Sequence, residues 1–307
     1  IDAYRIEILT DQEMPYGSAM IQFGYRTGNL IAGAGTIYLA TQFDWATAYA
    51  ATALCVFFGA VAALMMGEPA KPQGHEAPTR GAQTTPLAAM GGWLYGAIIT
   101  PFADFFRRQG LIGALLILCF VVIYKLGDAM GQEMLSPLIV DLGFSHEEYI
   151  WANKLVGFWA LMVGISLGAP VIKLLGMGRA LLWTGILMMV TNLVFAWLAL
   201  VGYNPALLAF AVGFENFTSG MGLTVFITYL SGLCSVAYSA TQYALLSALA
   251  SLARTFLSAP SGVLVERLDW AAFYVLTTIV ALPGLILLWL IWRRGLSDMP
   301  VQQEAPS

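Results

Sequence analysis

The sequence has little charge and few of the side chains that carry most enzyme chemistry. Only 10% of the 307 residues are charged, compared with about 25% in an average soluble domain. So few charges cannot give a globular core a water-facing surface, which excludes a soluble fold. The three cysteines, Cys55, Cys119 and Cys234, fall singly in separate apolar stretches. Their spacing fits neither a zinc site nor a disulfide framework, and we expect all three to be buried as small apolar side chains.

Histidine is equally scarce. His75 lies in a polar segment and His146 at the edge of an apolar one, so neither is placed beside a nucleophile or within a metal-ligand cluster. We therefore expect no catalytic residue, no metal and no cofactor, and a membrane-embedded enzyme is disfavoured. The net charge of −4 says little about partners, because loop Lys and Arg set membrane topology locally, and we expect no nucleic acid as a partner.

Long apolar stretches fill the chain instead. Apolar residues make up 59% of it, and eight stretches recur along its length. Each is long enough to cross a hydrocarbon core of ~30 Å as an α-helix. They predict an all-α, multi-pass membrane protein embedded in a lipid bilayer. The stretches cover residues 18–40, 46–66, 111–135, 148–171, 180–201, 205–230, 237–262 and 271–292.

A polar segment divides these stretches into two groups. Residues 68–81 are rich in Pro, Gly and charge and cannot bury apolar surface. Residues 101–108 end a shorter apolar run with aromatic and basic residues, a composition typical of a helix in the headgroup region. Most Lys and Arg fall on the linker's side of the predicted spans, which places that side in the cytoplasm. We predict two complete transmembrane helices in 1–66, a cytoplasmic linker with an interfacial helix in 67–108, a six-helix bundle in 109–294 and a polar cytoplasmic tail in 295–307.

An internal repeat relates the two groups. FDWATAY at residues 43–49 is echoed by LDWAAFY at 268–274, and the span before each copy carries one arginine, Arg26 or Arg254. Repeated halves are typical of secondary transporters. If each half has six spans, the part before the linker holds only the last two of the first half, and we expect this chain to begin near the end of a fourth span.

Ionisable residues inside the apolar stretches mark the predicted site. A charge that faces lipid near the centre of a span costs about 2.5–3.5 kcal/mol on the insertion scale. These residues should therefore face a polar cavity, although each could instead form a structural ion pair within the bundle. Lys125 and Asp128, three residues apart, could neutralise each other, which would leave a cationic excess suited to a substrate with carboxylates. The predicted substrate-binding residues are Gln22, Arg26, Asn29, Lys125, Asp128, Lys154, Asn216, Gln242 and Arg254.

Two smaller sets of residues have other predicted roles. A carboxyl group held in a polar cavity beside cations can exchange a proton at working pH, and the candidates for this proton coupling are Asp128, Glu133 and Glu215. Asp2 and Arg5 are predicted to belong to a cytoplasmic gate. A receptor or scaffold that keeps the fold without transporting is the alternative class, and it is disfavoured by these intramembrane charges.

Five segments, in order along the chain, resemble the AmpG-type muropeptide permeases of the major facilitator superfamily. They are IDAYRIE at 1–7, GYRTG at 24–28, PFADFFRR at 101–108, ENFTSGMG at 215–222 and SATQYALLS at 239–247. The resemblance implies a major facilitator-type fold, here with a partial N-terminal bundle and a six-helix C-terminal bundle.

The resemblance also implies a function. It is proton-driven import of anhydromuropeptides, the turnover products of peptidoglycan, from periplasm to cytoplasm across the bacterial inner membrane. This import would serve cell-wall recycling and link to β-lactamase induction. The alternative is a major facilitator transporter of another anionic solute, such as acetyl-coenzyme A, whose carriers share the Asp-containing opening motif. A coenzyme A carrier should need a denser basic cluster for its phosphates than this sequence has.

Overall fold

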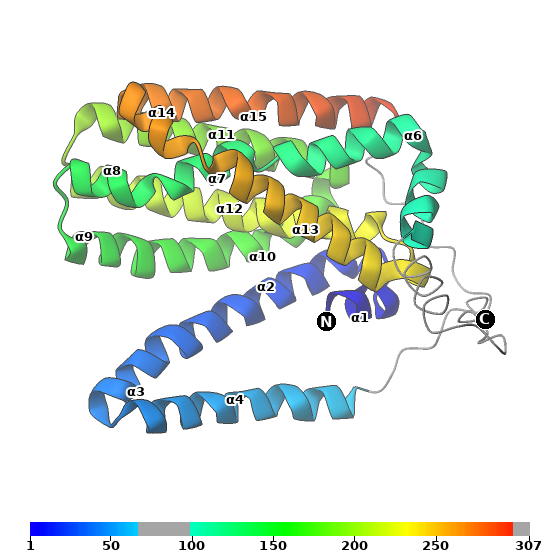
Figure 1. Ribbon diagram of the computed structural model, residues 1–307, viewed down its shortest axis with the longest axis horizontal. Helices are drawn as coiled ribbons and strands as arrows, with labels where there is room; N and C mark the ends of the chain where they lie inside the picture. The colour runs from blue at the N-terminus through cyan, green and yellow to red at the C-terminus, as the bar shows by residue number, and fades with distance from the viewer. Residues whose placement is uncertain (67–98, 297–307) are drawn as a thin grey trace, which may run out of the picture.

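The structure, a computed structural model, describes residues 1–66 and 99–296, and every regular element in these ranges is a helix (Figure 1). Seven helical runs there are long and apolar enough to span a membrane, which confirms the all-α membrane fold. They are Trp45–Met65, Thr100–Asp141, His146–Leu175, Met177–Val201, Pro205–Leu233, Val236–Arg267 and Trp270–Arg293. The remaining predicted span, residues 18–40, is also helical, but the polar residues along it keep it outside this set.

The N-terminal part is a helical hairpin preceded by a short helix. Helix α1 (Asp2–Ile8) leads into α2 (Met14–Leu30), which continues through the π-helical segment η1 (Ile31–Gly35) into α3 (Thr36–Gln42). Helix α4 (Trp45–Met65) then returns in the opposite direction, packed against α3 and diverging from α2 (Figure 1). The first turns of α2 pack against the C-terminal part of the chain, where Ala19 and Phe23 contact a cluster that includes Leu161 and Ile165.

The C-terminal part is a bundle of long helices. Its first run consists of α6 (Thr100–Ile123), α7 (Leu126–Glu133) and α8 (Leu135–Asp141), and its second of α9 (His146–Ile150), the π-helical η3 (Trp151–Gly157) and α10 (Phe158–Leu175). The others are α11 (Met177–Val201), α12 (Pro205–Leu233), the 3-10 helix η4 (Val236–Tyr238), α13 (Ser239–Ser258), α14 (Ser261–Arg267) and α15 (Trp270–Arg293). Helix α12 packs against α10 and α11 and so lies at the centre of the bundle.

The internal repeat has a structural cause. Asp44 and Asp269 are the N-caps of α4 and α15, and their carboxylates accept hydrogen bonds from the backbone N–H groups of Thr47 at 2.6 Å and Ala272 at 2.7 Å. Each cap satisfies a donor that the first helical turn leaves free. The two copies of the repeat therefore begin equivalent helices, although α4 and α15 lie at opposite ends of the chain.

Glycines allow α10 and α12 to pack backbone to backbone. A Cβ atom on Gly164 would lie 2.0 Å from the carbonyl oxygen of Phe217, and one on Gly220 would lie 2.6 Å from that of Leu161. No larger side chain fits at either position without moving a helix. This close approach is typical of helix pairs in membranes, where small residues replace the hydrophobic effect as the basis of association.

Helix α6 changes direction at Gly110, whose φ of 69° lies in the left-handed region that favours glycine. Residues 100–109 run across the end of the bundle and the rest of α6 runs along it (Figure 1). The predicted interfacial helix falls partly on this first segment, while residues 67–98 of the predicted linker and 297–307 of the predicted tail lie outside the described residues. The division into two bundles and a linker stays a prediction.

The expectation of three buried cysteines is wrong for two of them. Cys234 is buried, but Cys55 and Cys119 are exposed on their helices. The physical reason is that an apolar residue of a membrane protein can face lipid as readily as the interior, so an apolar stretch does not identify its buried side.

Candidate functional site

A polar pocket lies where α2 and η1 diverge from α10. Along α2 the early residues Met14 and Ser18 are buried, whereas residues 27–34 are exposed, and Figure 1 shows the helix leaving α10 toward α3. The pocket, which we call the α2–α10 pocket, has a volume of about 440 Å³. Its polar lining consists of Arg26, Asn29, Asn153, Lys154 and Asn216.

The π-helical segments η1 and η3 contribute to this pocket. Gly33 and Ala34 of η1 line it from one side, and Asn153 and Lys154 of η3 line it from the other. A π-helical turn is rare and is frequently found at functional sites. Two of them facing one cavity therefore support a binding role for it. The described lining holds two cations and no carboxylate, so an anionic group would meet no repulsion there.

A second polar pocket, which we call the α12–α13 pocket, has a volume of about 220 Å³. Lys125 lines it at the break between α6 and α7, and Arg254 lines it from α13 together with Ser247 and Ser251. The hydroxyl-bearing Tyr243 completes its polar lining. This pocket too has two cations and no carboxylate among its described lining residues, but one of the two, Lys125, is paired with Asp128 outside the lining.

Two buried carboxylates lie between these pockets. Asp128 is 8% exposed and Glu215 is 5% exposed. Asp128 Oδ2 lies 3.8 Å from Lys125 Nζ, so the ion pair predicted from their spacing is present. Gln132 Nε2 donates a hydrogen bond to Glu215 Oε1 at 2.6 Å and a longer one to Asp128 Oδ2 at 3.4 Å. The network therefore runs from Lys125, which lines the α12–α13 pocket, through Asp128 and Gln132 to Glu215 on α12.

Helix α7 is short because the backbone leaves the α-helical conformation at both of its ends. Lys125 has φ −103° and ψ 10°, and Met134 has φ −95° and ψ 2°. Discontinuous helices with charged residues at the break are how many transporters expose polar groups at the membrane midplane. The break turns Lys125 toward α13 and Asp128 toward the bundle interior, where Gly127 and Gly131 pack closely on α15 and α11.

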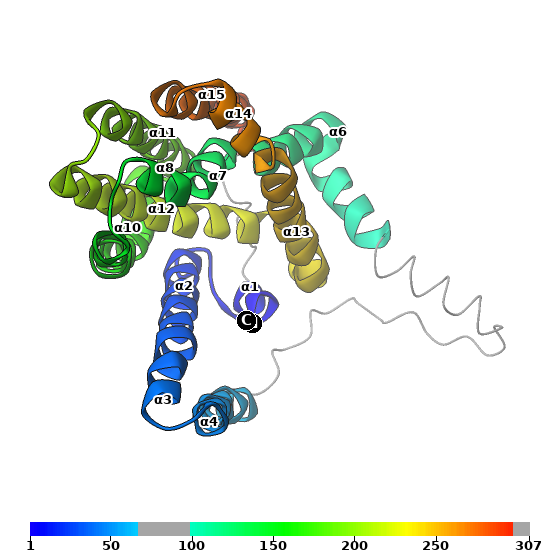
Figure 2. The same cartoon turned by 60° about the vertical axis from the view of Figure 1, so that its left-hand side comes forward.

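The predicted gate residues lie at the opposite end of α2. The Arg5 side chain is buried and donates hydrogen bonds to Ser18 Oγ at 2.8 Å and Ser231 Oγ at 2.5 Å. Asp2 Oδ1 lies 3.5 Å from the same guanidinium. Ser239 also donates to Glu7 at 2.6 Å, and Figure 2 shows α1 between α2 and α13. Helix α1 therefore joins the N-terminal hairpin to the C-terminal bundle at this end.

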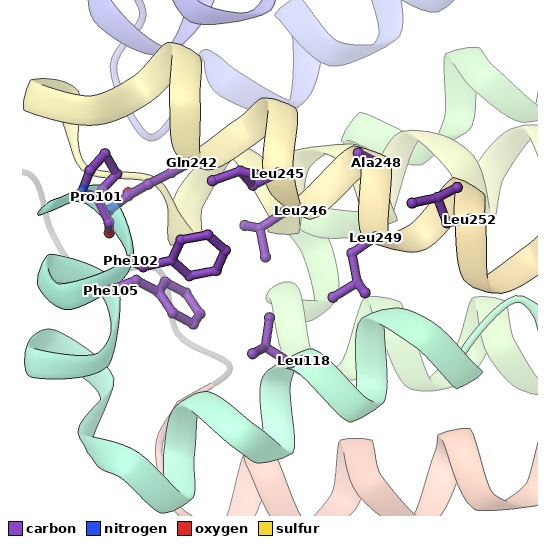
Figure 3. A pocket seen from close by; sticks show the side chains of 10 residues that line it. All are labelled: Pro101, Phe102, Phe105, Leu118, Gln242, Leu245, Leu246, Ala248, Leu249 and Leu252. Carbon is purple, nitrogen blue, oxygen red and sulfur yellow. The ribbon is translucent and has the colours of Figure 1, made fainter. Parts of the chain in front are cut away.

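Gln242 lies apart from both polar pockets. Its amide donates to the carbonyl oxygen of Pro101 at 2.9 Å and to Asp104 at 3.0 Å, and accepts from the backbone of Ser235 at 2.7 Å and from Arg108 at 3.0 Å. These bonds join the first segment of α6 to the turn before α13. Beside them lies an apolar pocket of about 370 Å³, in which Phe102 and Phe105 face Leu residues of α13 and Gln242 is the one polar residue of the described lining (Figure 3).

The structure thus gathers most, but not all, of the predicted site. Arg26, Asn29, Lys154 and Asn216 share one pocket, Lys125 and Arg254 share the other, and Asp128 and Glu215 lie between. Gln22 is half-buried on α2 outside the pocket lining, and Glu133 is exposed outside the network. Asn153 and Gln132 were not predicted. Asn153 precedes Lys154 in a segment whose π-helical conformation the sequence does not reveal. Gln132 follows Asp128 by one helical turn, but its partner Glu215 is 83 positions away.

Comparison with known proteins identifies the family. The family model of the Major Facilitator Superfamily matches residues 1–256. A Rickettsia felis protein named transporter AmpG 4 is 34% identical over 296 residues, which cover 96% of this chain and 68% of the relative. The anhydromuropeptide permease of Escherichia coli K12 is 34% identical over 297 residues, which cover 96% of this chain and 57% of the permease.

Apolar helices long enough to span a bilayer, with cationic pockets and buried carboxylates between them, define the class of multi-pass solute transporters. The chain belongs to the major facilitator superfamily, in which it is an AmpG-like transporter. Its substrate is accordingly a small molecule, and the protein functions within a membrane.

Proposed function

We propose that the protein imports anhydromuropeptides from the periplasm to the cytoplasm of a bacterium, across the inner membrane, for cell-wall recycling. The observation that carries this proposal is the 34% identity to the anhydromuropeptide permease of Escherichia coli over 96% of the chain. The two cationic pockets support it, because a muropeptide carries carboxylates that Arg and Lys bind by charge-assisted hydrogen bonds. In this proposal Gln22, Arg26, Asn29, Lys125, Asp128, Lys154, Asn216, Gln242 and Arg254 form or support the substrate path.

The proposed driving force is the proton gradient. Asp128 and Glu215 are the coupling carboxylates best supported by burial and by their shared hydrogen-bond partner, and Glu133 is a third candidate. Asp2 and Arg5 serve as the cytoplasmic gate. With the basic side of the membrane taken as cytoplasmic, the α1 end is the closed cytoplasmic end and the α2–α10 pocket opens toward the periplasm.

The test is uptake of labelled anhydromuropeptide into cells that lack their own permease and express the full-length protein. We expect accumulation that a protonophore abolishes, because the collapsed gradient no longer drives net import. The same cells carrying the empty expression vector serve as the control. A well-expressed protein that accumulates no muropeptide would refute the proposal. Uptake of labelled acetyl-coenzyme A by the same cells would instead support the alternative solute.

A further inference from the structure

Gln132 has an unusual position relative to the two buried carboxylates. It belongs to α7, whereas Glu215 belongs to α12, and the Gln132 side chain is largely exposed while both carboxylates are buried. Its amide nitrogen donates to Glu215 Oε1 at 2.6 Å and to Asp128 Oδ2 at 3.4 Å. The amide therefore covers the carboxylates on their open side and is the one described side chain that hydrogen-bonds to both.

The charges around this group make its hydrogen bonds sensitive to a proton. Lys125 is the sole ion-pair partner within 4 Å of either carboxylate in the described chain, and it pairs with Asp128. Glu215 has the Gln132 amide in place of a cation. The other titratable or charged groups within electrostatic range of the pair come from four further elements: Arg26 of α2, Arg254 of α13, Tyr124 beside the break before α7 and Tyr274 of α15.

The amide group suits both protonation states of a carboxyl partner. A glutamine N–H donates to an ionised carboxylate, and after the amide turns over, its carbonyl oxygen accepts from a protonated one. No apolar residue and no lysine can do both. Arg26 and Arg254 line the pockets, so an anion bound to them would weaken the positive potential at the carboxylates and favour the arrival of a proton.

We propose that Gln132 is the positioning residue that couples the proton to the substrate, by donating to the Glu215 carboxylate before proton binding and accepting from the carboxyl group afterwards. The proton arrives from water on the open side at Glu215 Oε1 and leaves to water on the other side after the helices rearrange, so no other group is consumed. This inference rests on the proposed proton-driven import and adds the residue that bridges the two carboxylates.

The test separates substrate movement from proton coupling in proteoliposomes of the full-length protein. Exchange of labelled for unlabelled anhydromuropeptide at equal pH on both sides needs no net proton movement, whereas accumulation against a gradient driven by a pH difference does. Gln132→Met keeps the length of the side chain but removes its amide. Gln42→Leu, at the exposed end of α3, is the matched control.

We expect Gln132→Met to retain exchange within about threefold of the wild type and to lose accumulation by about tenfold or more, the size expected for a lost hydrogen bond to a charged group. The pH midpoint of its exchange rate should move upward, because the ionised carboxylate has lost its donor. Gln42→Leu should change neither measurement.

Two results would overturn the role of Gln132. The first is a Gln132→Met variant whose accumulation and pH midpoint are both unchanged from the wild type. The second is a folded Gln132→Met variant that loses exchange and accumulation equally, which would place the residue in substrate binding or packing. A wild-type protein that exchanges muropeptide but does not respond to a pH difference would refute proton coupling itself, and with it this role.

Discussion

Replacing Gly164 with alanine should separate α10 from α12 and destabilise the bundle. The added Cβ would lie 2.0 Å from the carbonyl oxygen of Phe217 and 3.1 Å from the amide nitrogen of Met221. These are backbone atoms of a helix, which cannot rotate away as a side chain can. An ordinary contact begins near 3.4 Å, so the two helices must part by more than an ångström along a contact that also includes Gly168 and Gly220.

The cost of such overpacking is about 1–3 kcal/mol, and the loss of contacts along the rest of the interface places Gly164→Ala at the upper end. This corresponds to a decrease in the folding equilibrium constant of roughly 5- to 150-fold. Thermal unfolding of the purified protein in detergent should show a lower midpoint for this variant. Gly168→Ala should lower the midpoint as well, because its Cβ would lie 2.5 Å from the Cβ atom of Thr224, which is bonded to the α12 backbone and cannot rotate away.

The matched control is Gly59→Ala in the middle of α4, where nothing lies within 4 Å of the added Cβ. This change should be neutral or stabilising, because alanine favours a helix over glycine by about 1 kcal/mol. Equal midpoints for Gly164→Ala and Gly59→Ala would show that the α10–α12 approach is looser than described and would refute the reasoning. A normal midpoint with impaired transport would refute it as well, since the predicted defect is in packing.

Three further predictions concern single residues. Arg26→Gln should raise the KM for labelled anhydromuropeptide about tenfold or more, as expected for a lost charge-assisted hydrogen bond; an unchanged KM would remove Arg26 from the substrate site. Arg5→Met should lower the thermal midpoint by the equivalent of about 2 kcal/mol, since the side chain loses its hydrogen bonds to both serines. The same change at the exposed Arg267 should leave the midpoint unchanged, and equal effects of the two variants would contradict a stabilising role of Arg5. The Thr47 N–H lowers the pKa of Asp44 below its usual value. The capping hydrogen bond to the Asp44 carboxylate is therefore fully formed above the ordinary pKa of Asp. It is lost as the pH falls through the lowered pKa of Asp44. The protection factor of the Thr47 amide against hydrogen exchange should fall over that acidic range in the wild type and not in Asp44→Asn, and the same loss of protection in both proteins would refute the assignment.

The sequence predicted features that depend on local spacing. Apolar length located the helices, and the separation of Lys125 and Asp128 predicted their ion pair, because one helical turn brings such residues together. The repeat of Asp followed by Trp marked two helix starts, although the capping bonds of Asp44 and Asp269 became visible only in the structure.

The sequence could not predict features that depend on helix packing. The hydrogen bond between Gln132 and Glu215 joins residues 83 positions apart, and no periodicity relates one helix to the orientation of another. Gln242 appeared equivalent to the other polar residues inside spans, but the bend of α6 at Gly110 brings Asp104 and Arg108 to it. Whether this position contacts substrate stays a prediction.

The two π-helical segments have a consequence for alignments of relatives. A π-helical turn holds one more residue than an α-helical turn, so Ile31–Gly35 and Trp151–Gly157 each contain a position that a plain α-helix of the same length along its axis would omit. Removing one residue there would leave the flanking faces in their orientation, whereas the same deletion elsewhere in a span would rotate everything beyond it by about 100°. One-residue gaps within the spans that carry Arg26 and Lys154 should therefore fall in these segments, and a relative with such a gap would keep its fold while changing the shape of the α2–α10 pocket.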